Sequence, residues 1–113
     1  MSSPFITQDG TPEYVVHTGR RRRVVRGEQM EMQYSVGRAG EMGPSPHTHP
    51  NEQLSVVVQG SYDFLMDGRS WRVGVGDVVL IAPNVPHGAG LIHEDSVTLD
   101  FIAPPRTDYS ADG

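Results

Sequence analysis

Two histidines near the middle of the chain have the spacing of a metal site. His47 and His49 are two residues apart, so on an extended strand their rings point to the same face. Neutral imidazole nitrogen binds zinc, iron, nickel and copper, and two rings on one face can share an ion. Gln53 has the same parity, four residues on. The spacing indicates a metal site, although neighbouring histidines also occur on protein surfaces without an ion.

The absence of cysteine limits the chemistry that is open to this chain. Thiol catalysis, cysteine-held zinc and iron–sulfur clusters are all excluded. Any metal ion must therefore be held by histidine, aspartate, glutamate or glutamine.

One acidic residue lies in the middle of an apolar run. In residues 97–102 alternate side chains share a face, which groups Thr98, Asp100 and Ile102. The aspartate either faces solvent or an ion-pair partner, or it lies inside, where an unpaired charge is costly. Inside and near a metal, it would be placed for proton transfer to or from a bound substrate.

The elements that must position these residues are short strands. Thirteen glycines and nine prolines interrupt the chain and leave little room for helices. The runs rich in Val, Ile, Tyr and Phe are Tyr14–Thr18, Arg22–Val25, Met30–Val36, Leu54–Gln59, Tyr62–Met66, Trp71–Val73, Val78–Ile81 and Val97–Ile102. Asp67-Gly68 predicts a two-residue hairpin. The pattern predicts an all-β fold, either a sandwich, a jelly roll or a barrel.

The length of 113 residues fits one domain, spanning residues 1–113. The net charge is −5, and such a chain repels phosphate backbones, so we expect no nucleic-acid partner. The four arginines 20–23 would alternate between the two faces of a strand. They are interpreted as a solvated edge, or as a source of one or two contacts to a carboxylate ligand or a partner subunit.

The hydropathy pattern predicts a protein without a membrane partner. No stretch is long and apolar enough to span a bilayer. The first residues lack the charged and apolar regions of a signal peptide. We therefore expect a cytoplasmic protein.

Two segments resemble the two motifs of the cupin family. The first reads HTHPNEQ over residues 47–53 and is followed by Gly60; the second reads GDVVLIAPNVPH over residues 76–87. The motifs extend over about 41–60 and 76–91, with one hairpin between them, and the resemblance covers about residues 36–102. Asn84 stands where that family usually has glycine, and asparagine tolerates the left-handed conformation better than most residues.

The resemblance implies a single-domain cupin, a double-stranded β-helix or jelly-roll barrel with one divalent metal ion (Zn, Ni, Fe or Mn) in its wider end. It implies that His47, His49 and His87 are ligands. The fourth ligand of the family is usually a glutamate. Gln53 stands in that place, and Glu52, which has the opposite strand parity, is the alternative. A neutral amide leaves the full +2 charge on the ion, which makes it a stronger Lewis acid.

The segment DFIAPPRTD over residues 100–108 is similar to the uronate ring-opening cupins (KdgF-type). Those enzymes convert cyclic 4,5-unsaturated uronates, released by pectin or alginate lyases, into linear keto forms. The similarity implies that Asp100 transfers a proton and that Arg106 holds the substrate carboxylate by a bidentate contact. Ile102 departs from the pattern, because that position is aromatic in those proteins.

Three functions follow from these residues, each with a small-molecule ligand. The first is a metal-dependent isomerase or lyase-like enzyme acting on unsaturated uronates. The second is another metal-cupin reaction, either cyclisation of an aromatic polyketide or dioxygenation. The third is a non-catalytic module that binds a sugar or an acid. The family resemblance also implies a homodimer, formed through a sheet face or a swapped N-terminal strand.

Overall fold

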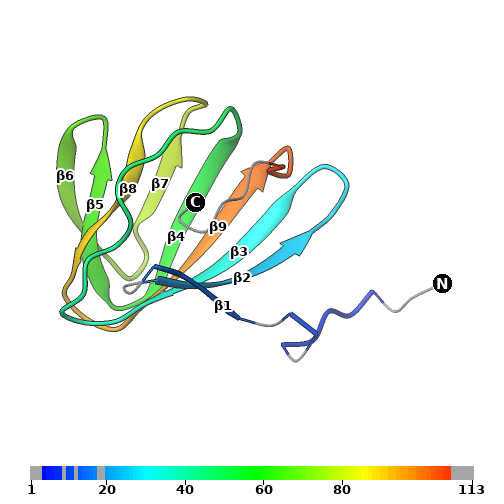
Figure 1. Ribbon diagram of the computed structural model, residues 1–113, viewed down its shortest axis with the longest axis horizontal. Coiled ribbons are helices and arrows are strands. Elements are labelled where there is room, and N and C mark those ends of the chain that lie inside the picture. Colours follow the sequence, from blue (N-terminus) through cyan, green and yellow to red (C-terminus); the bar gives the residue numbers. More distant parts are fainter. Residues whose placement is uncertain (1–3, 9, 12, 18–19, 108–113) are drawn as a thin grey trace.

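The computed structural model describes residues 4–8, 10–11, 13–17 and 20–107, which contain nine strands and no helix (Figure 1). The strands are β1 (Tyr14–His17), β2 (Arg20–Arg26), β3 (Glu31–Gly37), β4 (Glu52–Gln59), β5 (Ser61–Met66), β6 (Arg69–Gly74), β7 (Val78–Ile81), β8 (His87–Ile92) and β9 (Ser96–Ala103). The predicted all-β fold is confirmed. A helix able to cross a membrane is accordingly absent from the described part of the chain.

The strands form two antiparallel sheets. The larger sheet has the order β1-β2-β3-β9-β4-β7, and the smaller has the order β6-β5-β8. Figure 1 shows the smaller sheet on the left, with the larger sheet continuing to the right. The inner faces of the two sheets enclose one lumen, which is the architecture expected of a jelly-roll barrel.

The inner surface of this lumen has an apolar part and a polar part. The apolar part is the core cluster of Val57, Tyr62, Phe64, Val73, Ile81, Ala89 and Ile92. The polar part is carried by the larger sheet, where Glu31, Ser55 and Asp100 are each only 1% exposed. Buried polar groups are costly unless they are paired, and these three side chains are hydrogen-bonded to one another or to other polar residues.

Tight turns join the strands where the sequence predicts them. Asp67 and Gly68 both have positive φ angles, 50° and 78°, as a two-residue hairpin between right-twisted strands requires. Asn84 has a φ of 66°, so it takes the left-handed conformation expected of it. This turn lies directly before β8, whose first residue is His87.

Strand β8 is absent from the sequence prediction because its first four residues include two glycines. The first of them, Gly88, allows the segment between β3 and β4 to lie close against β8, as Figure 1 shows. A Cβ atom on Gly88 would lie 3.0 Å from the Pro44 carbonyl oxygen and 3.1 Å from the Pro46 Cα. The close approach lets His47 and His87 exchange backbone hydrogen bonds of 2.9 and 3.0 Å.

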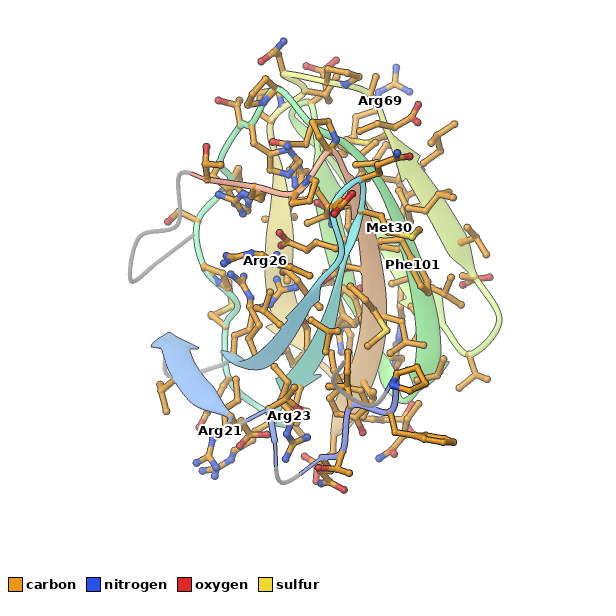
Figure 2. All side chains as sticks on the ribbon, turned by 90° about the vertical axis from the view of Figure 1, so that its right-hand side faces the viewer. Arg21, Arg23, Arg26, Met30, Arg69 and Phe101 are labelled. Carbon is orange, nitrogen blue, oxygen red and sulfur yellow. The ribbon has the colours of Figure 1, made fainter. Side chains whose placement is uncertain are left out.

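The arginine run of β2 divides between the two faces of the sheet. Arg20 and Arg22 face the lumen, and Arg22 is 2% exposed. Arg21 and Arg23 face outward, where both lie within 3.7 Å of the Glu13 carboxylate (Figure 2). The predicted division is confirmed. The solvated-edge interpretation is wrong, because β2 lies between β1 and β3 and the outer pair is only partly exposed and ion-paired.

Candidate metal centre

Three histidines from two distant segments converge in the lumen. His47 and His49 lie in the segment between β3 and β4, and His87 begins β8. The ring centroids are 5.6 Å apart for His47 and His49, 4.6 Å for His47 and His87, and 4.8 Å for His49 and His87. One nitrogen of each ring lies within 4.8 Å of the others. The structure therefore brings the three sequence-predicted histidines together.

Two ring nitrogens in this cluster lack a hydrogen-bond partner among the described residues. They are Nδ1 of His47 and Nε2 of His87, and both are buried. In His87 the other nitrogen, Nδ1, lies 2.9 Å from the Val85 carbonyl oxygen. A carbonyl accepts, so a neutral ring carries its proton on Nδ1 and leaves a lone pair on Nε2. A buried ring nitrogen with a lone pair and no hydrogen-bond donor beside it is suited to bind a metal ion.

Gln53 completes the cluster with an amide oxygen. Its Oε1 lies 2.9 Å from Nε2 of His49, and Nδ1 of the same histidine lies 3.0 Å from the Asn51 carbonyl oxygen. A neutral His49 that donates to Asn51 has a lone pair on Nε2, which then faces an oxygen lone pair. Two acceptors this close repel each other unless a cation lies between them. Three imidazoles and one amide oxygen fit a single divalent cation.

Burial favours the neutral form of His47 and His87, which is the form that binds a metal. Burial is the largest of the causes that together lower the pKa of His47 from 6.5 to about 3, and the nearby His87 and Arg106 add to it. Burial also lowers the pKa of His87, against the opposing effect of its hydrogen bond to the Val85 carbonyl. A divalent cation would thus meet rings whose lone pairs are free at neutral pH.

Glu52, the alternative fourth ligand, lies elsewhere. It is exposed at the start of β4, whereas the next residue, Gln53, is 7% exposed and faces the lumen. Adjacent residues of a strand point to opposite faces. The structure therefore places the amide, and not the neighbouring carboxylate, beside the histidines.

Asp100 lies inside the lumen and lines the same pocket as His47 and His87. Its carboxylate accepts three hydrogen bonds, from Ser55 Oγ at 2.6 Å, Ser35 Oγ at 3.0 Å and Arg20 Nη2 at 3.1 Å. The residue is buried, as the second of the two interpretations requires, and it is also ion-paired with Arg20, which the first interpretation included. All three partners lie on strands far from β9 in the sequence.

Arg106 follows β9 and also lines this pocket. The residue is 5% exposed. Its backbone nitrogen donates to Oε1 of the buried Glu31 at 3.0 Å, and the preceding Pro104 carbonyl accepts from Asn51 Nδ2 at 2.6 Å. Two side chains thus fix the path of the segment after β9, so that Arg106 stays at the pocket.

Sequence reasoning does not identify Ser35 and Ser55, and it names arginines 20–23 as possible ligand contacts without saying which of them reach the pocket. Arg20 and Arg22 join Arg106 in its lining, which makes it cationic on one side. Ser35 and Ser55 hold Asp100. A signal for them exists, because alternate residues of β3 and β4 are polar while their neighbours are apolar. The alternation identifies a polar face, but it does not say that this face is the inner one.

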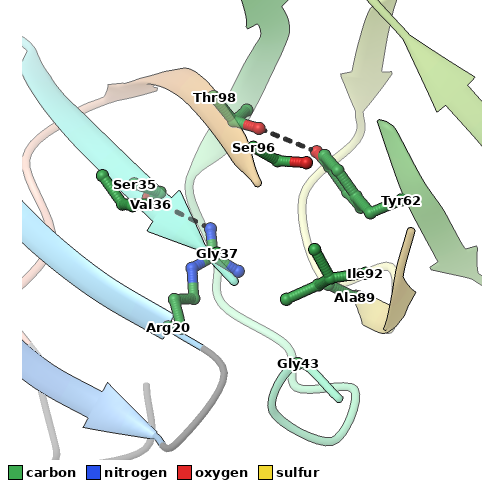
Figure 3. A pocket seen from close by; sticks show the side chains of 10 residues that line it. All are labelled: Arg20, Ser35, Val36, Gly37, Gly43, Tyr62, Ala89, Ile92, Ser96 and Thr98. Atoms are coloured by element: carbon green, nitrogen blue, oxygen red, sulfur yellow. Dashed lines mark hydrogen bonds between the residues drawn. The ribbon is translucent and has the colours of Figure 1, made fainter. Parts of the chain in front are cut away.

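A second compartment of the lumen adjoins the histidine pocket and shares Arg20, Tyr62 and Ala89 with it. Figure 3 shows it, with Arg20 donating to Ser35 and Thr98 donating to Tyr62 Oη at 3.1 Å. Burial raises the pKa of Tyr62, and the nearby Asp100 charge raises it further. The phenol therefore remains a neutral hydrogen-bonding group between the two compartments.

Comparison with known proteins places these features in context. A family model described as "Cupin domain" matches residues 38–102. The pectin degradation protein KdgF of Dickeya dadantii (strain 3937) is 26% identical over 106 residues, which cover 93% of this chain and 96% of that protein.

Two solved structures have the same fold. The structure of KdgF from Halomonas sp. matches with a TM-score of 0.82 and 24% identity, covering 95% of this chain and 98% of that one. An RmlC-like cupin from Shewanella frigidimarina NCIMB 400 matches with a TM-score of 0.83 and 24% identity, covering 96% and 97%.

Proposed function

The chain belongs to the cupin domain family, and on this basis we propose that it is a metal-dependent enzyme that opens unsaturated cyclic uronates released during pectin or alginate breakdown. A relative named for pectin degradation is similar over almost the whole length of both chains. The observation that carries the proposal is that Asp100 and Arg106 line one buried pocket together with His47 and His87.

The proposed ligands of the ion are His47, His49, Gln53 and His87. Their support is the convergence of three imidazoles and the acceptor pair of His49 and Gln53 at 2.9 Å. When bound, a divalent ion would act as a Lewis acid and stabilise negative charge that develops on substrate oxygens.

Asp100 is proposed to move the proton. Opening of the ring breaks the bond between the anomeric carbon and the ring oxygen, while the anomeric hydroxyl loses its proton and becomes an aldehyde. The ring oxygen becomes an enolate, and a proton returned to the distal alkene carbon yields the ketone. The reaction is an isomerisation, so one carboxylate that accepts and returns a proton balances it. The hydrogen bonds from Ser55 and Ser35 hold that carboxylate in place.

Arg106 is proposed to bind the substrate carboxylate. A guanidinium can grip a carboxylate by two parallel hydrogen bonds. Arg20 and Arg22 line the same pocket and add to its positive potential. This charge supports an anionic substrate over a neutral polyketide.

An absorbance assay with unsaturated galacturonate tests the proposal. We expect wild-type protein to accelerate loss of the alkene absorbance, and Asp100→Asn to slow it at least about a hundredfold, as for loss of a general base. Asp63→Asn is the matched control, because Asp63 pairs with His93 outside the pocket. A wild-type rate equal to that of buffer would refute the proposal, and substrate-dependent oxygen uptake would indicate a dioxygenase.

The partner that we propose for the chain is a second copy of itself. Strand register aligns an outer apolar face in two rows across the larger sheet. The face consists of Val25, Met32, Phe101, Leu54 and Leu80 in one row, and of Tyr34, Leu99, Val56 and Val78 in the other. Figure 2 looks onto this side and labels Phe101. Leu54, Val78 and Leu80 are exposed, and the other six residues are partly exposed. Soluble monomers rarely expose broad apolar patches, which supports a homodimer through this face.

A further inference from the structure

We infer that Ser55 is a positioning residue that holds the Gln53 amide with its oxygen towards the three histidines. The inference rests on the proposed metal centre and extends it to a residue outside the ligand set. Ser55 lies on β4, two residues after Gln53, and is 1% exposed. It touches none of the three histidines by hydrogen bond in the described structure, so any effect on the ion must pass through the amide.

The hydroxyl of Ser55 has one proton, and the acceptor of that proton determines which way the Gln53 amide is oriented. It donates to Asp100 Oδ1 at 2.6 Å, and an ionised carboxylate can only accept. The hydroxyl oxygen is left with lone pairs, one of which accepts from Gln53 Nε2 at 3.0 Å. The amide nitrogen must therefore face Ser55, and the amide oxygen faces Nε2 of His49 at 2.9 Å.

The two hydrogen bonds of Ser55, one accepted from Gln53 and one donated to Asp100, form a relay that opposes rotation of the Gln53 amide by half a turn. In the reversed state the Gln53 nitrogen would donate to Nε2 of His49, and the amide oxygen would face the oxygen of Ser55. The serine proton is already given to Asp100, so two acceptors would then face each other. The reversed state would also occupy the imidazole lone pair and turn an amide N–H towards the cation. Ser55 thus keeps the Gln53 oxygen and the Nε2 lone pair of His49 available to bind an ion.

The relay also accounts for glutamine at a position where the family usually has glutamate. A carboxylate at position 53 has no proton to give to Ser55. It would compete with Asp100 for the single hydroxyl proton, and two buried carboxylates would share one donor. Ser55 and Gln53 therefore fit each other.

Ser35 provides a matched control for the test. It donates to the other oxygen of Asp100 at 3.0 Å and is 4% exposed. It has no contact with Gln53 among the hydrogen bonds of the described residues. Ser35→Ala and Ser55→Ala each remove one hydroxyl from Asp100, but only the second releases the amide.

The experiment is calorimetric titration of the metal-free full chain with Ni²⁺ alone. We expect Ser55→Ala to weaken Ni²⁺ binding at least about tenfold, as is usual for loss of a group that orients a ligand, and Ser35→Ala to change it less than about twofold. Ser55→Thr, which keeps the hydroxyl, should recover most of the affinity. NMR supplies a second readout: the side-chain amide protons of Gln53 should exchange with solvent faster in Ser55→Ala.

The results distinguish failure of the proposed metal centre from failure of the role inferred for Ser55. A wild-type chain that binds no Ni²⁺ would overturn the metal centre and this inference with it. A wild-type chain that binds Ni²⁺, with Ser55→Ala unchanged or weakened no more than Ser35→Ala, would overturn the role of Ser55 alone. If Ser55→Ala does not fold, the Ni²⁺ affinity of Ser55→Thr is compared with that of Gln53→Ala instead. A folded Ser55→Thr that binds Ni²⁺ as weakly as Gln53→Ala would contradict the relay.

Discussion

The imidazole of His47 is partly buried beside other groups that carry or can carry positive charge. Burial, His87 and Arg106 together lower its pKa from 6.5 to about 3. In the unfolded chain the same ring returns to its ordinary pKa. The folded state thus excludes a proton that the unfolded state takes up between these two values.

Stability of the metal-free protein should therefore fall as the pH decreases. Above about pH 6.5 neither state protonates His47, and the pKa of the folded state lies near 3, so the loss extends over this interval. One such proton contributes a slope of at most about 1.4 kcal/mol per pH unit. Urea unfolding between pH 7 and pH 5 measures how the free energy of unfolding depends on pH. This range is chosen because most carboxylates stay ionised in it. His47→Gln should flatten the slope, and a slope equal to that of the wild type would contradict the assigned burial.

At the same scale, the sequence predicts which residues meet but not how they are held. The spacing of His47 and His49, with the second motif, suffices to predict the cluster. Asp100 remains open in the sequence, because alternation defines a face without saying which face is inside. Its partners Ser35 and Arg20 are 65 and 80 residues away, and nothing local in the chain links them to it.

Among the elements, β8 decides the geometry of the centre. Its backbone pairs with the segment between β3 and β4 and so fixes His47 beside His87. Glycine is unfavourable in a strand, which is why the propensity pattern misses this element. The glycine is needed for the contact, because a larger side chain at Gly88 would meet the backbone of Pro44 and Pro46.

Gly88→Ala should separate the two halves of the centre. A Cβ atom there lies 3.0 Å from the Pro44 oxygen, so that segment must shift. We expect a loss of about 1–3 kcal/mol in the free energy of unfolding and weaker Ni²⁺ binding. Gly90→Ala is the control on the same strand, since its Cβ would make contacts of 3.4 Å to the side chains of Asp63 and Leu65. Equal Tm and Ni²⁺ affinity in the two variants would contradict this role of β8.

The larger sheet as an element reverses the usual distribution of side chains. Its inner face carries Ser55 and Asp100, while Leu54 and Leu80 on its outer face are 42% and 60% exposed. The sequence predicts these strands from their alternation, and it is the usual burial of apolar side chains that would favour the apolar side as the inner one. The proposed site and the proposed dimer would account for the observed arrangement, because such a site needs polar groups inside and a partner chain would cover the apolar face.

For the whole molecule, the expected assembly is a dimer of 12.4 kDa chains. Leu80→Glu places a charge in the outer apolar face and should convert the dimer to a monomer in sedimentation velocity. Val75→Glu is the control, because Val75 is 69% exposed at the turn between β6 and β7, outside that face. A monomeric wild type, or equal dissociation of both variants, would contradict the proposed interface.

The central claim is that the chain holds one divalent ion through three imidazoles and an amide. Elemental analysis of untagged protein, purified without chelators, tests it most directly. We predict about one divalent ion per chain in the wild type and almost none in His87→Ala that is folded by circular dichroism. A wild-type protein that contains no ion, and whose Tm does not change when Zn²⁺, Ni²⁺, Fe²⁺ or Mn²⁺ is added, would contradict the account.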